Sequence, residues 1–433
     1  PRPAEPQPQM GRKVLFESLE QRILLSADPV AAVTDGALNV DLTDGDDSVL
    51  IEQFDDGNDT NGIDIRITID GVLLDEFSGV DTITVDGLTG DDTFEFVDVT
   101  VGVTVTGGEG SDTLLGPNSS NTWVINDDNS GSLNGLITFN AIENLEGGTS
   151  DDTLTGPNAN TTWNIGVFGE NEDGDEIVIA AQDAGNLNDE ISFSSMENLV
   201  GGGEIDEFAF GYGASTGATI SGLIDGGTGN NILDFSAYQD AVAINLESQT
   251  STGGTFAGTV TDVVGGESIL DELTGVAEDS AWNVSEADGG EIRGVVVFSS
   301  FENLRGQAGN RDTFVFEAEG SLGTIDNPGS IDGGGGGVDS LMIAKGDDLG
   351  GYAAINVNAT GSGAVTDVFG QSFGYANLEP VVVTSTTTTT NDTVQINGSV
   401  LTDRIVLESV TSGSSALQLR SVGADIYDDC LLY

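Results

Sequence analysis

Short apolar runs alternate with polar residues along most of the chain. In segments such as RIVLE (404–408) and LQLRS (417–421), apolar and polar side chains follow one another residue by residue. Such alternation over about five residues is typical of a β-strand with one buried face. Because Gly, Asn, Asp and Thr separate these runs, we predict short strands joined by tight turns and almost no helix beyond residue 30.

A composite repeat organises these strands. It contains a Gly-Gly corner, an acid five or six residues later, a Trp, a Phe and then Glu-Asn-Leu. The spacing of the corners is close to 40 residues, except where the acidic segment FGENEDGDEIVIAA (168–181) adds 14 residues and where one corner follows another after 25. The corners begin at Gly107, Gly147, Gly201, Gly226, Gly265 and Gly306.

Repeats of this length that are rich in short strands are typical of stacked units that share one core. We therefore predict an all-β fold, a parallel β-solenoid with coils of roughly 20 residues, two coils to each repeat. The alternative is an array of small β-sandwich repeats. That alternative is weaker, because units of about 40 residues rarely hold a core without disulfides or metal.

The expected organisation has four parts. Residues 1–29 form a leader or sorting segment, which opens with the proline-rich PRPAEPQPQ and has Met10 as a candidate start. Residues 30–383 form the repeat region and 384–393, TSTTTTTNDT, a Thr-rich linker. Residues 394–433 form a further β-strand segment that we expect to be truncated.

The leader carries a resemblance. Phe16, Leu19 and Ile23 have helical spacing, which predicts a short amphipathic helix. The stretch LEQRILLSAD (19–28) resembles the LEPR-XLL motif found near the N-terminus of very long, repetitive bacterial exported proteins, with Gln21 where that motif has proline. The resemblance implies an N-terminal fragment of a large exported protein, extracellular or at the bacterial cell surface.

Composition excludes several classes of partner. The chain has 73 Asp plus Glu against 11 Lys plus Arg, a formal net charge of −62, which excludes nucleic acid and anionic membrane surfaces and favours divalent cations. With no histidine and the single Cys430, histidine triads, zinc-histidine sites and an intrachain disulfide are excluded. No apolar run approaches the roughly 20 residues that span a membrane, so we expect no membrane insertion.

The corner GGEGSDTLL (107–115) is the candidate metal site. It fits the nonapeptide G-G-x-G-x-D-x-U-x of the hemolysin-type RTX family, which implies Ca²⁺ held by turn carbonyls and an aspartate. The matching candidate ligands are Gly107, Gly108, Gly110 and Asp112, and in the looser copy at 147–155 they are Gly147, Gly148 and Asp152. In that family consecutive nonapeptides share the calcium, whereas here the corners lie about 40 residues apart. The other interpretation is therefore a purely architectural glycine-aspartate corner.

Two further motifs recur in each unit. The tryptophans precede β-branched residues with strand spacing, which favours rings that stack in the core over an exposed platform for sugars. In Glu-Asn-Leu, the asparagines could share amide hydrogen bonds between coils, and the glutamates would face solvent or help to hold cations. These residues are Trp123, Trp163 and Trp282, Asn144, Asn198 and Asn303, and Glu143, Glu197 and Glu302.

The leading functional expectation is a non-enzymatic structural and adhesive part of a large secreted or cell-surface β-solenoid, with divalent cations and cell-surface or matrix polysaccharide as partners. One alternative is a calcium-binding RTX-like module that folds on export. A second is a polysaccharide-active β-helix enzyme. It is disfavoured because acid pairs such as Asp91 and Asp92 sit in turns or on opposite faces, and because Arg293, Arg305 and Arg311 are the only local basic cluster.

Overall fold

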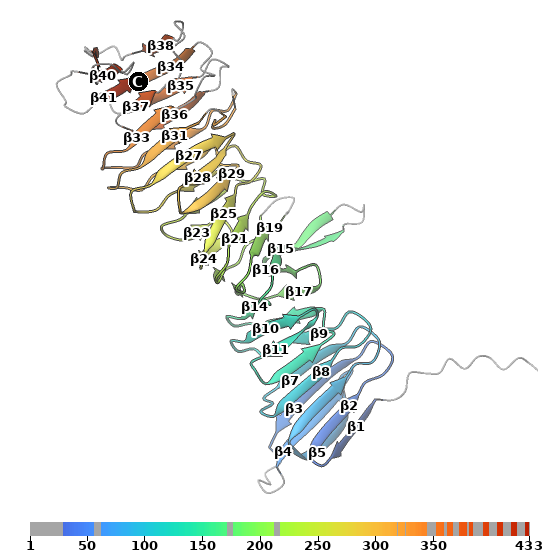
Figure 1. Cartoon of the computed structure of the whole chain (residues 1–433). Coiled ribbons are helices and arrows are strands. Elements are labelled where there is room, and N and C mark those ends of the chain that lie inside the picture. Colours follow the sequence, from blue (N-terminus) through green and yellow to red (C-terminus); the bar gives the residue numbers. More distant parts are fainter. Residues whose placement is uncertain are drawn as a thin grey trace, which may run out of the picture.

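The computed structural model is an elongated stack of strands that runs from β1 (Val30–Thr34) to β41 (Asp429–Leu432) (Figure 1). It describes residues 29–55, 62–170, 176–211, 217–317, 319–324 and 326–343, and further along 352–358, 362–366, 372–378, 381–383, 393–397, 405–409, 417–421 and 429–432. Every helix or strand assigned in these residues is a strand, which confirms the all-β prediction. The predicted leader helix lies in residues 1–28, outside the described residues.

Two sheets run the length of the stack, and the chain passes from one to the other at each corner. In the first sheet, Val85 of β6 (Thr82–Asp86) pairs in parallel with Val105 of β8 (Gly102–Thr106). In the second sheet, Phe94 of β7 (Thr93–Val97) pairs in parallel with Leu114 of β9 (Thr113–Leu115). In both sheets, the paired residues of neighbouring strands are 20 positions apart in the sequence.

The remaining single strands continue these parallel ladders. In the first sheet they are β2 (Ala37–Asp41), β14 (Thr153–Thr155), β18 (Asn198–Val200), β20 (Leu223–Asp225), β26 (Glu272–Thr274), β30 (Asn303–Arg305), β32 (Ser330–Asp332) and β38 (Thr393–Asn397), with β1 antiparallel to β2. In the second they are β13 (Asn144–Glu146), β19 (Asp206–Phe210), β21 (Asn231–Asp234), β25 (Val260–Val264), β31 (Thr313–Phe316), β33 (Ser340–Ile343) and β37 (Val381–Val383).

Three-stranded antiparallel meanders interrupt the ladders, so both sheets are mixed. Within each meander that has a neighbour on both sides, the third strand pairs in parallel with the preceding coil and the first strand with the following coil, as β12 does with β8 and β10 with β14. Successive meanders alternate between the two sheets. They comprise β3 (Ser48–Phe54), β4 (Ile63–Ile69) and β5 (Val72–Val80); β10 (Thr122–Asp127), β11 (Ser130–Leu133) and β12 (Ile137–Asn140); β15 (Thr161–Glu170), β16 (Glu176–Leu187) and β17 (Ile191–Ser194); β22 (Ala243–Asn245), β23 (Thr250–Ser251) and β24 (Gly254–Ala257); β27 (Ala281–Glu286), β28 (Gly289–Ile292) and β29 (Val296–Ser299); β34 (Tyr352–Asn358), β35 (Ser362–Thr366) and β36 (Ser372–Ala376); and β39 (Ile405–Ser409), β40 (Leu417–Ser421) and β41.

The meanders correct the predicted coil length. Equivalent corner residues of successive coils are 20 residues apart from Asp92 to Asp112, as expected. They are 31 residues apart from Asp112 to Glu143 and 45 from Asp152 to Glu197, because a meander lies between. The acidic insertion at 168–181 falls in the hairpin of β15 and β16, which projects from the stack in Figure 1, so the extra residues lengthen a meander and leave the ladder intact.

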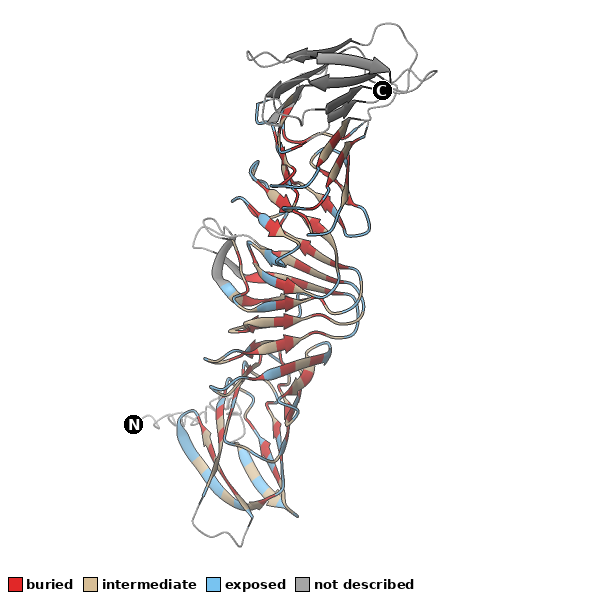
Figure 2. Cartoon of the chain, turned by 90° about the vertical axis from the view of Figure 1, so that its left-hand side faces the viewer, coloured by how far each residue is buried: buried red, intermediate tan, exposed pale blue. Residues whose placement is uncertain are grey.

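The core lies between the two sheets and is built from the inward residue of each strand (Figure 2). Trp123, Trp163 and Trp282 have no exposed surface, which confirms that their rings point inward. Each ring contacts a Phe of its own meander edge-on, with centroid distances of 6.1 to 6.3 Å. Trp163 and Trp282 also stack on Phe208 and Phe314 of the next coil, so aromatic contacts connect coils as well as strands.

Glycine makes room for each indole. A Cβ atom on Gly156 or on Gly275 would lie 2.6 Å from Cζ2 of Trp163 or Trp282, respectively. Such a contact is far inside van der Waals separation, and a rigid indole packed on all sides cannot move away from it. The glycine seven residues before each of these tryptophans is therefore a packing requirement.

Candidate functional site

Each corner buries one acidic or amide side chain beside the start of a strand. These side chains have at most 6% of their surface exposed, although they carry groups that water solvates strongly. The buried corner residues are Asp47, Asp92, Asp112, Asn121, Asp152, Asp206, Asn231, Asp271, Asp312 and Asp339. We call this set the corner ladder.

The corner ladder connects the backbone of one coil to a side chain of the next. The N–H of Asp47 donates to Oδ1 of Asp92 at 2.8 Å, and the N–H of Asp92 donates to Oδ1 of Asp112 at 2.8 Å. The same contact recurs between Asp206 and Asn231 at 2.9 Å. A backbone N–H at a corner has no strand partner, so the side chain of the next coil satisfies a donor that would otherwise be buried unpaired.

Where the next coil begins with Glu-Asn-Leu, that motif replaces the aspartate. Glu143 Oε2 accepts the N–H of Asp112 at 2.9 Å, and both the N–H and Nδ2 of Asn144 donate to the carbonyl of Asp112. The motif therefore holds the aspartate of the previous coil by its N–H and its carbonyl together. Glu197 and Asn198 hold Asp152 in this way, and Glu302 and Asn303 hold Asp271.

These contacts overturn one expectation about the motif and, at Glu302, a second one. The asparagines donate to aspartate carbonyls and do not form an amide stack with one another. The glutamates were expected to face solvent or cations, yet each accepts a main-chain N–H, and Glu302 is only 8% exposed. Sequence spacing alone could not identify these partners, because they lie 31 to 46 residues away.

The predicted corner glycines have two separate roles. Gly108, Gly110 and Gly148 have φ of 120°, 147° and 122°, a region that favours glycine, so they allow the corner to turn. Gly107 and Gly147 instead allow close approach. A Cβ on Gly107 would lie 1.9 Å from the carbonyl oxygen of Ala141 and 2.5 Å from Oδ2 of Asp112.

The second oxygen of several corner carboxyls has no partner. Oδ2 of Asp92, Asp112, Asp152 and Asp312 is buried and makes no hydrogen bond within the described part of the chain. Burial raises the pKa of Asp92 to about 7 and that of Asp152 to about 6, and neighbouring acids add to both shifts. Burial also raises the pKa of Asp112 and of Asp312. These four carboxyls are therefore weakened acids in a dry core.

The candidate calcium ligands are distributed over two corners. Asp112 receives the N–H of Asp92, and Asp152 receives the N–H of Asn121 at 2.6 Å, so one oxygen of each carboxyl is already used by the backbone. Across the described ranges, no three His, Cys, Asp or Glu side chains come together in a group that could hold a metal ion. Calcium at Gly107, Gly108, Gly110, Asp112, Gly147, Gly148 and Asp152 stays a prediction.

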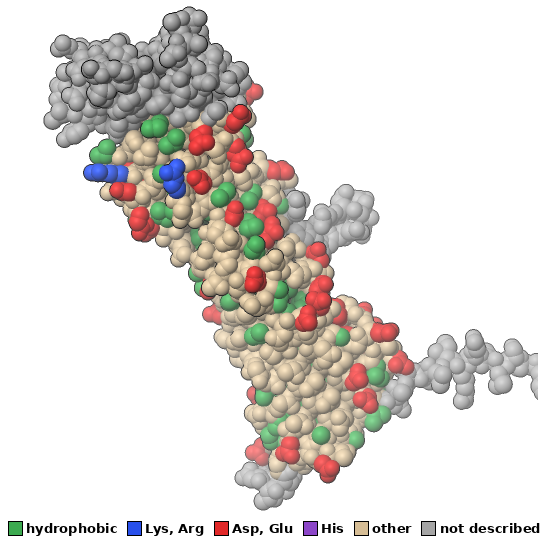
Figure 3. All heavy atoms as spheres, viewed as in Figure 1, with side chains coloured by type: hydrophobic (Ala, Val, Ile, Leu, Met, Phe, Trp, Pro, Cys, Tyr) green, Lys and Arg blue, Asp and Glu red, His purple; other side chains and the backbone are tan. Residues whose placement is uncertain are grey.

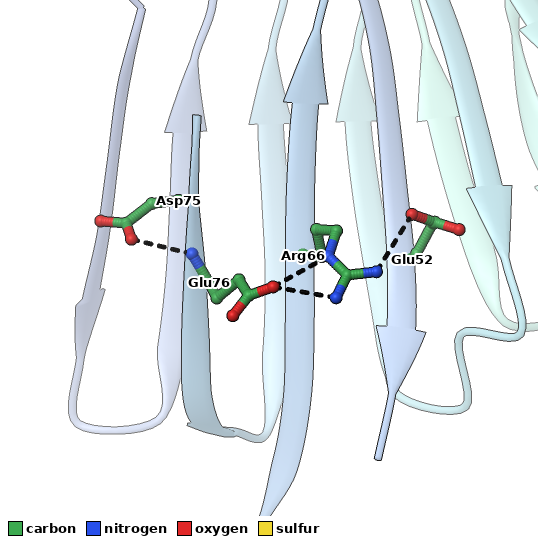
Figure 4. Close-up of polar contacts among 4 residues, drawn as sticks. All are labelled: Glu52, Arg66, Asp75 and Glu76. Carbon is green, nitrogen blue, oxygen red and sulfur yellow. Dashed lines mark hydrogen bonds and ion pairs between the residues drawn. The ribbon is translucent and has the colours of Figure 1, made fainter. Parts of the chain in front are cut away.

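Outside the core, the surface is acidic with little compensation (Figure 3). The ion pairs of the described residues involve Arg66 and Arg293. Arg66 contacts Glu76 at 2.9 Å and Glu52 at 3.9 Å on the exposed face of β3, β4 and β5 (Figure 4). Its guanidinium also lies over the ring of Phe54. Exposed pairs of this kind contribute little to stability, so the acidic surface is balanced chiefly by solvent ions.

Comparisons with known proteins do not assign this chain to a family. No protein-family model matches the sequence, and no curated protein is significantly similar to it. The described residues contain no helix that is long and apolar enough to span a membrane.

Sequence reasoning found part of the corner ladder. The acid five or six residues after a corner glycine includes Asp112, Asp152 and Asp312, but its burial and backbone partners were not expected. Asp47 was missed because it follows Leu42 and Thr43, where other corners have glycine. The sequence signal that could have identified Asp47 is an acid five residues after the corner, with a strand directly after it.

Proposed function

We propose that the chain is a section of a parallel β-solenoid and serves as a non-enzymatic structural and adhesive rod of a large exported bacterial protein. The observation that carries this proposal is the corner ladder, in which a buried side chain of one coil accepts the main-chain N–H of the previous coil. Such contacts join neighbouring coils and have no role within a single one. A chain that repeats them gains an axial connection along its whole length.

The hydrophobic contacts support the same conclusion. Buried apolar residues from Leu38 to Leu378 belong to one cluster, whereas an array of separate β-sandwiches would have several. The parallel registers from β2 to β6 and β8 also favour successive coils of one solenoid. In such an assembly each repeat is stabilised by its neighbours and not by itself.

The acidic surface supports the proposal of an extended, well-solvated rod. A net charge of −62 keeps parallel rods apart and draws divalent cations to the surface without a dedicated site. The buried corner carboxyls do not suit catalysis on a polymer, because Asp92, Asp112 and Asp312 have at most 1% of their surface exposed. The resemblance of residues 19–28 to the LEPR-XLL motif is the ground for the bacterial exported setting.

Two measurements test this proposal. Small-angle X-ray scattering of the full chain at high salt should give a maximum dimension and cross-section of a rod, and a globular profile would contradict the rod. Binding of the labelled chain to intact bacterial cells and to purified matrix polysaccharides should exceed that of an equally acidic, unrelated protein. Equal retention of the two proteins would contradict the adhesive role and leave the rod to be judged by scattering alone.

A further inference from the structure

The core of the stack is incompletely covered at its N-terminal end. In the first sheet β1 pairs with β2 alone, and in the second sheet β5 pairs with β4 alone. Within the described part of the chain, each of these two strands therefore has one edge without a neighbouring strand, and Figure 1 shows both at the same end of the stack. Interior coils, in contrast, have a neighbouring coil on both sides.

On β5, side chains that face the core are exposed. Val72, Asp75 and Phe77 each pair with an isoleucine of β4 that is at most 6% exposed, and paired residues of an antiparallel ladder point to the same face of the sheet. Val72 is nevertheless 68% exposed, Asp75 is exposed and Phe77 is half-buried. The core face of β5 thus extends beyond the elements that cover it.

The same pattern occurs on β1. Ala31 and Val33 pair with Val40 and Leu38 of β2, which are at most 1% exposed, yet both remain only partly buried. Like Phe77, they pack against the end of the apolar core. The terminal units of repeat proteins need a cover of this apolar surface, because no further repeat stacks on it.

Asp75 indicates which kind of occupant fits this end. Its carboxylate accepts the N–H of Glu76, and the ion pairs of the described residues include no basic partner for it. A further coil stacked on β5 would bury this charge in the core, and an inward acid on an edge strand opposes such addition. A second copy of the chain would bring another net charge of −62 to an acidic end. The occupant that fits is therefore apolar on one side, basic beside that side, and not a strand.

The segment directly before β1 has this chemistry. Residues 12–27 lie outside the described residues, and their sequence predicts an amphipathic helix. We call its apolar positions the leader stripe, which comprises Phe16, Leu19 and Ile23. Arg12 stands four residues before Phe16, so it continues the leader stripe by one helical turn. A basic group is thus placed next to the apolar side chains.

The length and attachment of this segment also fit. At about 1.5 Å per residue, a helix over residues 12–27 is about 24 Å long. The nine residues of β5 span about 30 Å at about 3.3 Å per residue, so the helix is long enough to lie across most of this end. Pro29 disfavours helix in the residue before it and leaves a short connection to β1 at Val30. This connection holds the segment beside the open end at high effective concentration.

From these observations we infer that residues 12–27 cap the N-terminal end of the rod as an amphipathic helix. The leader stripe lies on the exposed core faces of β1 and β5, and the guanidinium of Arg12 pairs with the carboxylate of Asp75. The leader is then a structural part of the rod, which covers its first coil and blocks the addition of a second copy.

Hydrogen–deuterium exchange of the full chain, measured by mass spectrometry of its peptides, tests whether the cap exists. Leu19→Asp with Ile23→Asp places two charges in the leader stripe and should speed exchange several-fold in peptides of β1 and β5, but not in those of β10 and β14. The matched control, Val14→Asp with Gln21→Asp, adds two charges on the opposite side of the helix and should exchange like the parent. Equal exchange at β1 and β5 in the parent and the stripe variant would overturn the proposal.

Cross-linking tests where the segment docks. In a chain with Cys430→Ser, which removes the native thiol, Arg12→Cys with Asp75→Cys should give an intrachain product with a short bismaleimide. Arg12→Cys with Asn39→Cys is the control, because Asn39 is exposed on the outer face of β2, and it should give clearly less product. Equal yields from the two pairs would show a tethered but undocked segment and overturn the proposal. A predominantly interchain product through Asp75→Cys would also overturn it, because a second copy would then occupy the end.

Discussion

Oδ1 of Asp112 accepts the backbone N–H of Asp92 at 2.8 Å, and the two residues are 20 positions apart. The N–H of Asp112 in turn donates to Oε2 of Glu143, and its carbonyl accepts Nδ2 of Asn144. One residue thus takes part in hydrogen bonds to the coil before and the coil after it. This continuity makes the corner a natural place to test the fold.

The Glu-Asn-Leu contact predicts the effect of removing one amide. Asn144→Ala deletes the Nδ2 donor to the Asp112 carbonyl and should destabilise the chain by about 0.5–1.5 kcal/mol. Urea denaturation followed by tryptophan fluorescence measures the change. Asn39→Ala, on an exposed strand position whose amide makes only a local bond, is the matched control and should change stability little.

The tryptophan packing predicts a penalty for a single methyl group. Gly156→Ala would bring Cβ to 2.6 Å from the Trp163 ring, and overpacking of this kind costs about 1–3 kcal/mol. Gly102→Ala places its Cβ in open space on an exposed strand and should be neutral or slightly stabilising. Equal denaturation midpoints for the two variants would show that the indole is not fixed against the glycine.

The surroundings of Glu302 predict that the stability of the chain depends on pH. Burial, together with Asp288 and Asp271, raises its pKa from 4.5 to about 7, so its stabilisation is present below pH 4.5 and is lost as the pH rises through about 7. Glu302→Gln keeps an oxygen for the Asp271 N–H and should be more stable than the parent at pH 8 but not at pH 4.

Unfolding curves of the parent and the Gln variant at the two pH values measure this difference. Glu302→Ala leaves the Asp271 N–H without its acceptor and should lose stability at both pH values. A Gln variant that is less stable than the parent at pH 8 would contradict the assignment.

Asp112→Asn separates the two interpretations of the glycine corner. An amide oxygen can still accept the Asp92 N–H, so an architectural corner needs no charge, whereas a calcium site does. We expect the circular dichroism spectrum and melting temperature of parent and variant to respond alike to chelator and to millimolar calcium. A calcium-dependent gain in stability that only the parent has would instead support the RTX-like interpretation.

The strands and their inward faces were predictable because alternation and tryptophan position are local properties. Trp123, Trp163 and Trp282 were placed correctly from two or three neighbouring residues. The partners of the corner side chains were not predictable, because a meander changes the distance between equivalent residues from 20 to 31 or 45. The cost of like charges in register predicted that Glu143 faces solvent or cations, whereas its Oε2 accepts the N–H of Asp112, a residue 31 positions earlier.

The order of strands within a meander has a consequence for how the chain assembles as it emerges from the ribosome. β10 is made before β12, yet β12 is the strand that adjoins β8, and β10 adjoins the later β14. The first strand of a meander has no parallel neighbour until the chain has turned back twice and filled the gap behind it. All three strands of a meander must therefore be made before the meander can pair with the strand that precedes it. Each completed meander then presents an open strand edge, with which the next strand pairs. A chain released in the middle of a meander would expose two incomplete edges, which makes these points the places where interrupted synthesis or proteolysis is most damaging.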